Sequence, residues 1–161
     1  MEIISEIEVS KEQHQAITDL RNSAFPDHQV ERSYYKQLPH MRALEYREGR
    51  LAGYLGLDYR MISVGDSAYK VRGQGVGTSM LSELDEYAKN RDVDFIILIS
   101  DLHDFYSSQG YVQTPSTNSW LRLHEHLSYG VAVEEINDLY VKSLNGKQWC
   151  LGDVDWLGYM Y

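Results

Sequence analysis

The sequence predicts an α/β (α+β) fold in a single domain, Met1 to Tyr161. Three observations lead to this prediction. Apolar residues alternate with acidic ones at the start of the chain, and a glycine-rich segment in the middle runs directly into an apolar helix pattern. A continuous apolar run from Asp94 to Ser100 is typical of a strand that is buried on both faces. The length of 161 residues suits one domain with a sizeable core.

The first part of the chain predicts a strand followed by helices. Met1 to Val9 alternates as a half-buried strand does, and Ser10 with Gln13 forms the pattern of a capping box. Apolar residues at helical spacing then continue to Pro26, which ends the helix. A second, shorter helix is expected over Glu31 to Gln37.

A hairpin and further strands are expected after these helices. Arg42 to Tyr46 and Arg50 to Tyr59 are predicted to pair through a turn at Glu48-Gly49, and Gly65-Asp66 marks another turn. The helix after the glycine-rich segment is expected to end at about Asn90. Later elements are a short helix and three strands, at His103 to Gln109, Tyr111 to Thr114, Thr117 to His124 and Asp138 to Ser143.

Composition excludes several classes of partner. Acidic residues outnumber basic ones by 24 to 15, which gives a formal charge of −9 with neutral histidines. We therefore expect neither nucleic acid nor a membrane as a partner, whereas a cationic substrate is compatible with this charge. The single cysteine, Cys150, excludes an internal disulfide. No leader pattern opens the sequence and no apolar run approaches the ~20 residues of a membrane span, so we expect a cytoplasmic protein.

The glycine-rich segment is the strongest candidate for a binding site. Glycines at 73, 75 and 77 let backbone N–H groups approach a ligand closely, because no Cβ stands in the way. The following helix points its positive end at the same place, and Arg72 adds a cation. These features together predict a site for a phosphate group.

Two common phosphate loops do not fit this segment. A nucleotide-hydrolase loop needs a lysine after its last glycine, and Thr78 follows Gly77 directly. A dinucleotide fingerprint would place glycine or alanine at position 78 and an acidic residue at the end of a later strand, whereas Asp94 precedes its strand.

The pattern Arg72-x-x-Gly75-x-Gly77 resembles the pyrophosphate loop of the GNAT superfamily of N-acetyltransferases. A second motif, Phe105-Tyr106-x-x-x-Gly110-Tyr111, resembles a later signature of the same family, with Tyr111 in place of the usual Phe. The resemblance implies a central mixed, mostly antiparallel sheet flanked by helices, with acetyl-CoA as cosubstrate and no metal. It implies that CoA is bound by Val71, Arg72, Gly73, Gln74, Gly75, Val76, Gly77 and Thr78.

The same resemblance assigns Tyr106 as the general acid that serves the departing sulfur. The sequence departs from the family at one place. Members of the family carry a full fourth strand before the arginine, whereas only Ser67 to Val71 lies between the turn and Arg72. This segment is about ten residues shorter than the corresponding segment of the family, which forms a full strand. Either it is a true deletion or residues are missing from the sequence, and the second interpretation is favoured.

The acceptor side is predicted less directly. Asp153, Asp155 and Trp156 place carboxylates beside an aromatic ring, which suits a polyamine or aminosugar cation, and they resemble the C-terminal segment of aminoglycoside 2'-N-acetyltransferases. Tyr34 is a further candidate, because the family places the loop after its first helix near the acceptor. Glu45, Asp58, Asp153 and Asp155 are candidates for the general base.

These features predict an acetyl-CoA-dependent N-acetyltransferase that acts on a primary amine of a small, cationic acceptor. The alternatives are a non-catalytic acyl-CoA-binding module and a protein lysine acetyltransferase, and a homodimer stays open. His124 and His126 supply two metal ligands without a third, so no metal is expected.

Overall fold

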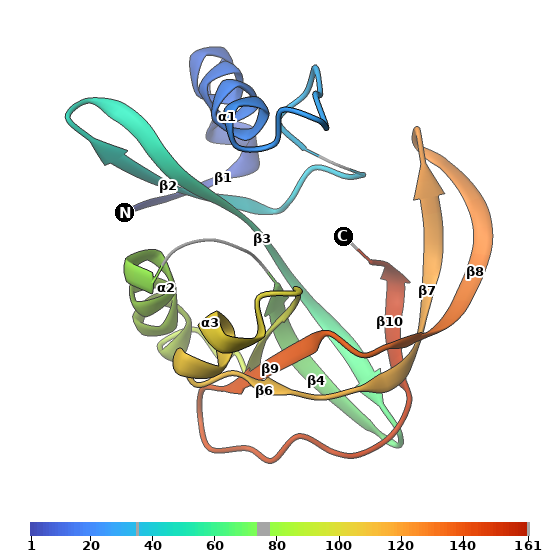
Figure 1. The fold of residues 1–161 in the computed structure, drawn as a ribbon. Helices are drawn as coiled ribbons and strands as arrows, with labels where there is room; N and C mark the ends of the chain where they lie inside the picture. The colour runs from blue at the N-terminus through green and yellow to red at the C-terminus, as the bar shows by residue number, and fades with distance from the viewer. Residues whose placement is uncertain (35, 74–77, 161) are drawn as a thin grey trace.

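The computed structural model describes residues 1–34, 36–73 and 78–160, without the side chains of 68–73 and 78 (Figure 1). In this part of the chain ten strands form one mixed sheet, and most neighbouring strands are antiparallel. The parallel pairs are β4 with β5 and β7 with β10. The predicted fold class, a mixed and mostly antiparallel sheet flanked by helices, is confirmed.

The described elements follow the chain in this order: β1 (Glu2–Ser5), the 3-10 helix η1 (Glu6–Glu8), α1 (Lys11–Ala24), β2 (Met41–Arg47), β3 (Arg50–Val64), β4 (Ser67–Gly73), α2 (Thr78–Lys89), β5 (Phe95–Ile99), α3 (His103–Ser108), β6 (Val112–Gln113), β7 (Ser116–His124), β8 (Leu127–Ile136), β9 (Leu139–Ser143) and β10 (Val154–Tyr159). The main path through the sheet runs β6-β9-β5-β4-β3-β10-β7-β8, and β1 and β2 extend it beside β3.

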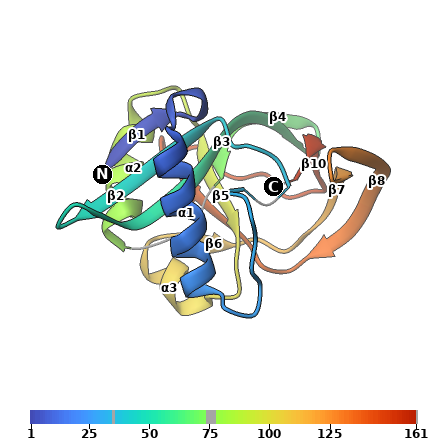
Figure 2. The ribbon, with the colours of Figure 1, turned by 90° about the horizontal axis from the view of Figure 1, so that it is seen from above.

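The helices cover opposite faces of the β2–β3 hairpin. In Figures 1 and 2, α1 lies on one side of this hairpin and α2 with α3 on the other. The alternation of the strands explains this arrangement, because Leu44 packs against Ile17 of α1 while its neighbour Ala43 packs against α2. A further core cluster, which includes Ile97, Trp120 and Trp156, joins β3, β5 and β9 to β7, β8 and β10.

The 15-residue strand β3 changes its partners half-way along. Its first half, up to Leu57, pairs with β2, whereas Asp58 to Val64 pairs with β4 on the opposite edge. β10 joins at Ser63 and Val64, on the same edge as β2. Among the described residues, no strand therefore pairs with the β4-side edge of β3 before Asp58.

The local signals near the N-terminus predicted helix α1 correctly. The Ser10 side chain accepts a hydrogen bond from the backbone of Gln13, and the Gln13 side chain accepts one from the backbone N–H of Ser10. The hairpin turn is also confirmed, with both Glu48 and Gly49 at positive φ. The first strand is shorter than expected, since Glu6–Glu8 forms a 3-10 helix.

The expected helix over Glu31 to Gln37 is wrong, because the described residues of this stretch form bends and extended backbone. A buried ion pair explains the difference. The guanidinium of Arg42 donates to both carboxylate oxygens of Glu6, at 2.6 and 3.1 Å, and also to the Ser33 hydroxyl at 3.4 Å. His14 of α1 contacts the same hydroxyl at 2.7 Å. Tertiary hydrogen bonds therefore hold this segment in an irregular conformation.

A central strand precedes the glycine-rich segment, so the expected shortage does not remove the fourth strand. Ser67–Gly73 forms β4, and this strand includes Arg72 and Gly73, which were predicted to lie in the loop. Pairing with β3 on one edge and β5 on the other satisfies its backbone groups and makes the strand stable. Over the described residues, β4 pairs only with Asp58 to Val64, so no described strand covers the first half of β3 on this edge.

Breaking the buried ion pair should destabilise the fold. We expect Arg42→Met to lower the free energy of unfolding by about 3–5 kcal/mol, because it leaves the Glu6 carboxylate buried without its cation. Urea denaturation measures this change. The double variant Glu6→Leu/Arg42→Met should recover most of the loss, and Arg47→Met, at an exposed position of β2, should stay within about 0.5 kcal/mol of the wild type. A single Arg42→Met variant as stable as the wild type would contradict this account.

Candidate functional site

The ends of two parallel strands and the start of a helix meet at one edge of the sheet. β4 and β5 run parallel, with Gly73 opposite Ile97, so their C-terminal ends lie at the same edge. Helix α2 begins at Thr78, shortly after β4 ends, and directs the positive end of its dipole to this edge. In open α/β arrangements this edge is the usual place for a ligand.

Two described residues, Gly73 and Thr78, flank the central part of the predicted CoA loop. Gly73 is the last residue of β4 and lies opposite Asp58 of β3, and Thr78 is the first residue of α2. Residues 74–77 lie outside the described part of the chain, as do the side chains of Val71, Arg72 and Thr78. Their assignment to CoA stays a prediction.

Tyr106 lies beside the same edge, on α3, which follows β5. Its side chain is buried and belongs to the core cluster that also contains Met80 and Leu81, from the first turns of α2. Its ring lies 5.6 Å from the ring of Tyr111 in an edge-on contact and 5.8 Å from that of Tyr140. The structure therefore brings Tyr106 and the start of α2 into one cluster, while its role as an acid stays a prediction.

Tyr140 forms the polar part of this aromatic cluster. Its hydroxyl lies 2.9 Å from Nδ1 of His103. Burial raises the pKa of Tyr140, and the carboxylates of Asp138 and Asp104 raise it further. The phenol is therefore neutral near pH 7 and can serve as a hydrogen-bonding group.

Asp58 is a buried carboxylate beside the end of β4. It lies opposite Gly73, is only 4% exposed, and has its Oδ1 atom 3.3 Å from Nδ1 of His40. The other oxygen, Oδ2, lies 3.6 Å from Nη2 of Arg60. The backbone N–H of Tyr59 also donates to Nδ1 of His40, at 3.1 Å. Asp58 was a candidate base in the sequence, but His40 and Arg60 were missed, since the spacing along the chain gives no sign that they meet.

The other candidate bases lie in different surroundings. Glu45 is near the start of the chain in space, with Oε2 3.1 Å from the amino nitrogen of Met1. Asp153 and Asp155 are exposed, and Asp155 accepts a hydrogen bond from the backbone of Leu157. Asp58 is therefore the only one of these four carboxylates that is both buried and beside the end of β4.

The predicted acceptor residues lie in two separate environments. Tyr34 stacks obliquely on His126 at 6.3 Å, with the Arg32 guanidinium 5.0 Å from its ring. Trp156 is fully buried in the core, and its Nε1 donates to Asn118 at 2.9 Å. Because strand residues alternate, Trp156 points away from its exposed neighbour Asp155. Tyr34 thus contacts His126 and Arg32, whereas Trp156 contacts Asn118, and the acceptor role of all four residues stays a prediction.

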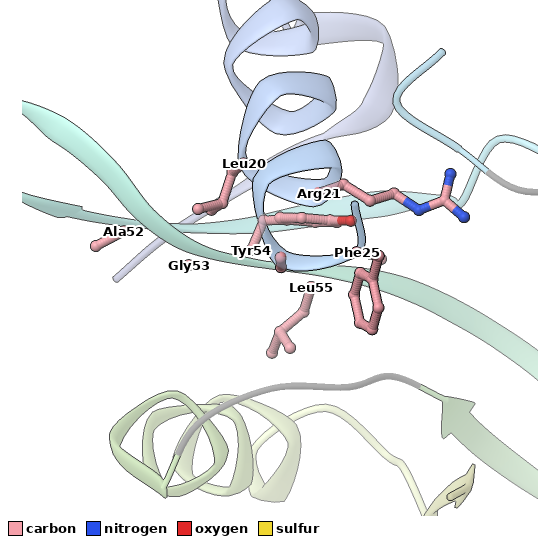
Figure 3. Close-up of a pocket in the computed structure, with 9 residues that line it drawn as sticks. Leu20, Arg21, Phe25, Ala52, Gly53, Tyr54 and Leu55 are labelled. Carbon is pink, nitrogen blue, oxygen red and sulfur yellow. The ribbon is translucent and has the colours of Figure 1, made fainter. Parts of the chain in front are cut away.

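A pocket of about 360 Å³ lies at the unpaired edge of β3 (Figure 3). It is lined by the end of α1 and the middle of β3, namely Leu20, Arg21, Ala24, Phe25, Ala52, Gly53, Tyr54, Leu55 and Gly56. In Figure 3 the side chains of Leu55 and Phe25 point toward the side on which α2 lies. Burial raises the pKa of Tyr54, although Arg21 and Arg42 lower it in part, so this phenol is neutral as well.

Sequence patterns did not reveal this pocket. It depends on where β4 stops pairing with β3, which is a tertiary property. Its one sequence signal is the run Ala52-Gly53, where a β-carbon on Gly53 would lie only 2.8 Å from Sδ of Met80. A side chain at position 53 would therefore require the Met80 side chain to shift, which glycine avoids.

Two further searches concern metals and membranes. Among the described residues, no three His, Cys, Asp or Glu side chains come together in a way that could hold a metal ion. None of the helices in the described ranges has both the length and the apolar character needed to cross a membrane.

Comparisons with known proteins support the fold. No model of a protein family matches the chain, and no curated protein matches its sequence significantly. Among solved structures, it is similar to a conserved protein of unknown function from Enterococcus faecalis V583, described as a probable N-acyltransferase, with a TM-score of 0.53 and 13% identity. The match covers 73% of this chain and 33% of that protein, so the chain corresponds to about a third of its neighbour's length. At 13% identity the likeness concerns the fold alone. The fold of this chain is compatible with an acetyltransferase-like fold.

Proposed function

We propose that this chain is an N-acyltransferase of the GNAT type, which moves an acyl group from acyl-CoA, in the simplest case acetyl-CoA, to a primary amine. One observation carries the proposal. Gly73 at the end of β4, the start of α2 and the core cluster that contains Tyr106 lie at the C-terminal edge of β4 and β5. The neighbour described as a probable N-acyltransferase supports the same class of reaction.

The anionic part of CoA would bind at the start of α2. Backbone N–H groups and a helix dipole favour a pyrophosphate, and the guanidinium of Arg72 can add a charge-assisted hydrogen bond. This chemistry fits the residues present between Gly73 and Thr78. The acyl end of the donor would then lie near the end of β4.

The transfer needs one bond to form and one to break. The neutral amine attacks the thioester carbonyl carbon, the new C–N bond forms, and the C–S bond then breaks. The sulfur leaves as a thiolate, and we assign the hydroxyl of Tyr106 to donate a proton or a hydrogen bond to it. The proton that the amine loses goes to a base, directly or through water.

Asp58 with His40 is our candidate for that base. The pair lies beside Gly73, and a hollow of about 430 Å³ next to it gives room for an acceptor. This hollow is lined by His40, Arg60, Met61, Trp156, Leu157, Gly158 and Tyr159. A buried carboxylate beside the hollow suits a cationic amine, such as a polyamine or an aminoglycoside. A lysine side chain of a protein presents the same group and remains an alternative acceptor.

Binding of acetyl-CoA should depend on Arg72. We expect Arg72→Gln to weaken binding by about 10- to 100-fold, the usual range for losing a hydrogen bond to a charged group. Isothermal titration measures the change, with the exposed Arg47→Gln as the matched control that keeps wild-type affinity. Equal affinity of the Arg72 variant, or displacement of CoA by micromolar ATP or NAD, would refute the assignment of the loop.

Turnover should depend on Tyr106 more than binding does. We expect Tyr106→Phe to lower the rate of thiol release by about 100-fold or more, with the affinity for acetyl-CoA nearly unchanged, because the phenol acts mainly on the departing sulfur. Thiol release is measured with a panel of candidate acceptor amines, namely polyamines, aminoglycosides, amino acids and lysine peptides. Tyr111→Phe is the control, since the family usually carries Phe there. Tight binding of acetyl-CoA without thiol release on any amine would support the binding module instead.

A further inference from the structure

The pocket at the edge of β3 is chemically different from the acceptor hollow. Most of its lining is apolar, with Leu20, Ala24 and Phe25 from α1 and Ala52 and Leu55 from β3. Among the described residues that line it there is no carboxylate, and the same holds for the lining of the acceptor hollow, which is more polar because it includes His40 and Arg60. A volume of about 360 Å³ lies in the range of small-molecule sites.

Arg21 is the one ionised group of the lining, and it limits the choice of ligand. In Figure 3 its guanidinium points away from the side chains of Leu20 and Leu55, so that its stem borders the pocket. Burial raises the pKa of Tyr54, and the charge of Arg21 opposes this rise in part. A cationic amine would lose its hydration beside apolar side chains here, whereas an uncharged hydrocarbon would bury apolar surface without a charge to desolvate.

The pocket is also close to the predicted transfer site. Gly56 lies at one end of the pocket lining, two residues before Asp58, which is roughly 7 Å along an extended strand. Asp58 in turn pairs with Gly73 at the end of β4. At the other end Gly53 approaches Met80 of α2. The β3 side of the pocket therefore runs from near the end of β4 to a residue that contacts the first turn of α2, where the donor would be bound.

The open strand edge suits the arm of CoA as well. The C=O of Leu57 and the N–H of Tyr59 form hydrogen bonds with His40, on the β2 side of β3. Because backbone groups of a strand alternate between its two edges, those of Tyr54 and Gly56 point to the other edge, where no described strand pairs. An extended ligand with amide groups can pair with such an edge as a strand does. Acyl-CoA combines an extended, amide-containing arm with a hydrocarbon end.

We propose that this pocket holds the hydrocarbon chain of an acyl group longer than acetyl, so that the donor is a medium-chain acyl-CoA. The inference rests on the proposed function and refines its donor. The transfer itself is unchanged: the carbonyl carbon passes from sulfur to the amine nitrogen, CoA leaves as the thiol, and the amine proton goes to the base.

Titration with acetyl-CoA, hexanoyl-CoA and octanoyl-CoA tests this proposal. A fully buried methylene contributes about fourfold in affinity, and because the pocket is partly open we expect octanoyl-CoA to bind about 10- to 100-fold more tightly than acetyl-CoA. Ala24→Phe, at an exposed position on the pocket rim, should remove most of this advantage and leave acetyl-CoA binding unchanged. Ala52→Phe is a second filling variant on the other wall. Ser23→Phe adds the same ring one residue away, outside the lining, and should have no effect.

The outcomes separate the two proposals. If acetyl-CoA binds but octanoyl-CoA binds no more tightly, or if both filling variants keep the advantage in a folded protein, the acyl pocket is refuted and the proposed function stands. If no CoA ester binds, the proposed function fails first. Octylamine, titrated in the presence of acetyl-CoA, tests the other source of a hydrocarbon: binding that Ala24→Phe and Ala52→Phe abolish would assign the pocket to the acceptor and overturn the proposal.

Discussion

The fold depends on how strand β3 divides its hydrogen bonds between partners. Its first half completes the β1–β2–β3 layer under α1, and its second half joins β4 and the rest of the sheet. A single continuous strand therefore connects the two parts of the core, and its side chains alternate between them. Because an extended strand of this length is stiff, the position of α1 relative to α2 follows from it.

The candidate site lies at the point where β3 changes partners. Asp58 is the first residue of β3 to pair with β4, and it lies opposite Gly73, the last residue of β4 before the glycine-rich segment. The buried carboxylate, the end of the parallel pair and the start of α2 are thus placed by one change in pairing. A shift of the β3–β4 register by one residue would turn the side chain of Asp58 to the opposite face of the sheet.

Sequence patterns predicted the elements whose signals are local. The capping box of Ser10 and Gln13, the Glu48-Gly49 turn and the buried strand after Asp94 all lie where their patterns indicate. The expected helix after Glu31 fails because Ser33 is held by Arg42 and His14, from distant parts of the chain. Strand β8 was missed, although the alternation of apolar residues from Leu127 to Val133 is a strand signal.

The candidate site was predictable only in part. The assignments of Arg72 and Tyr106 rest on spacing along the chain, since each belongs to a short motif, and they stay predictions. The contact of His40 with Asp58 does not, because it joins the residue before β2 to the middle of β3 through the pairing of those strands. The pocket at the β3 edge could not be predicted from the sequence, because it depends on which backbone groups have no described strand beside them.

The short β4 strand and the apolar pocket are one feature of the fold. If β4 continued beyond Gly73 in its present register, its next residues would pair with Leu57 and then with the Gly56 to Ala52 stretch that lines the pocket. A full-length strand would therefore satisfy the open edge and occupy the space between β3 and α2. The short segment before Arg72 thus has a structural consequence: among the described residues it leaves room beside the first half of β3, where a longer strand would pair.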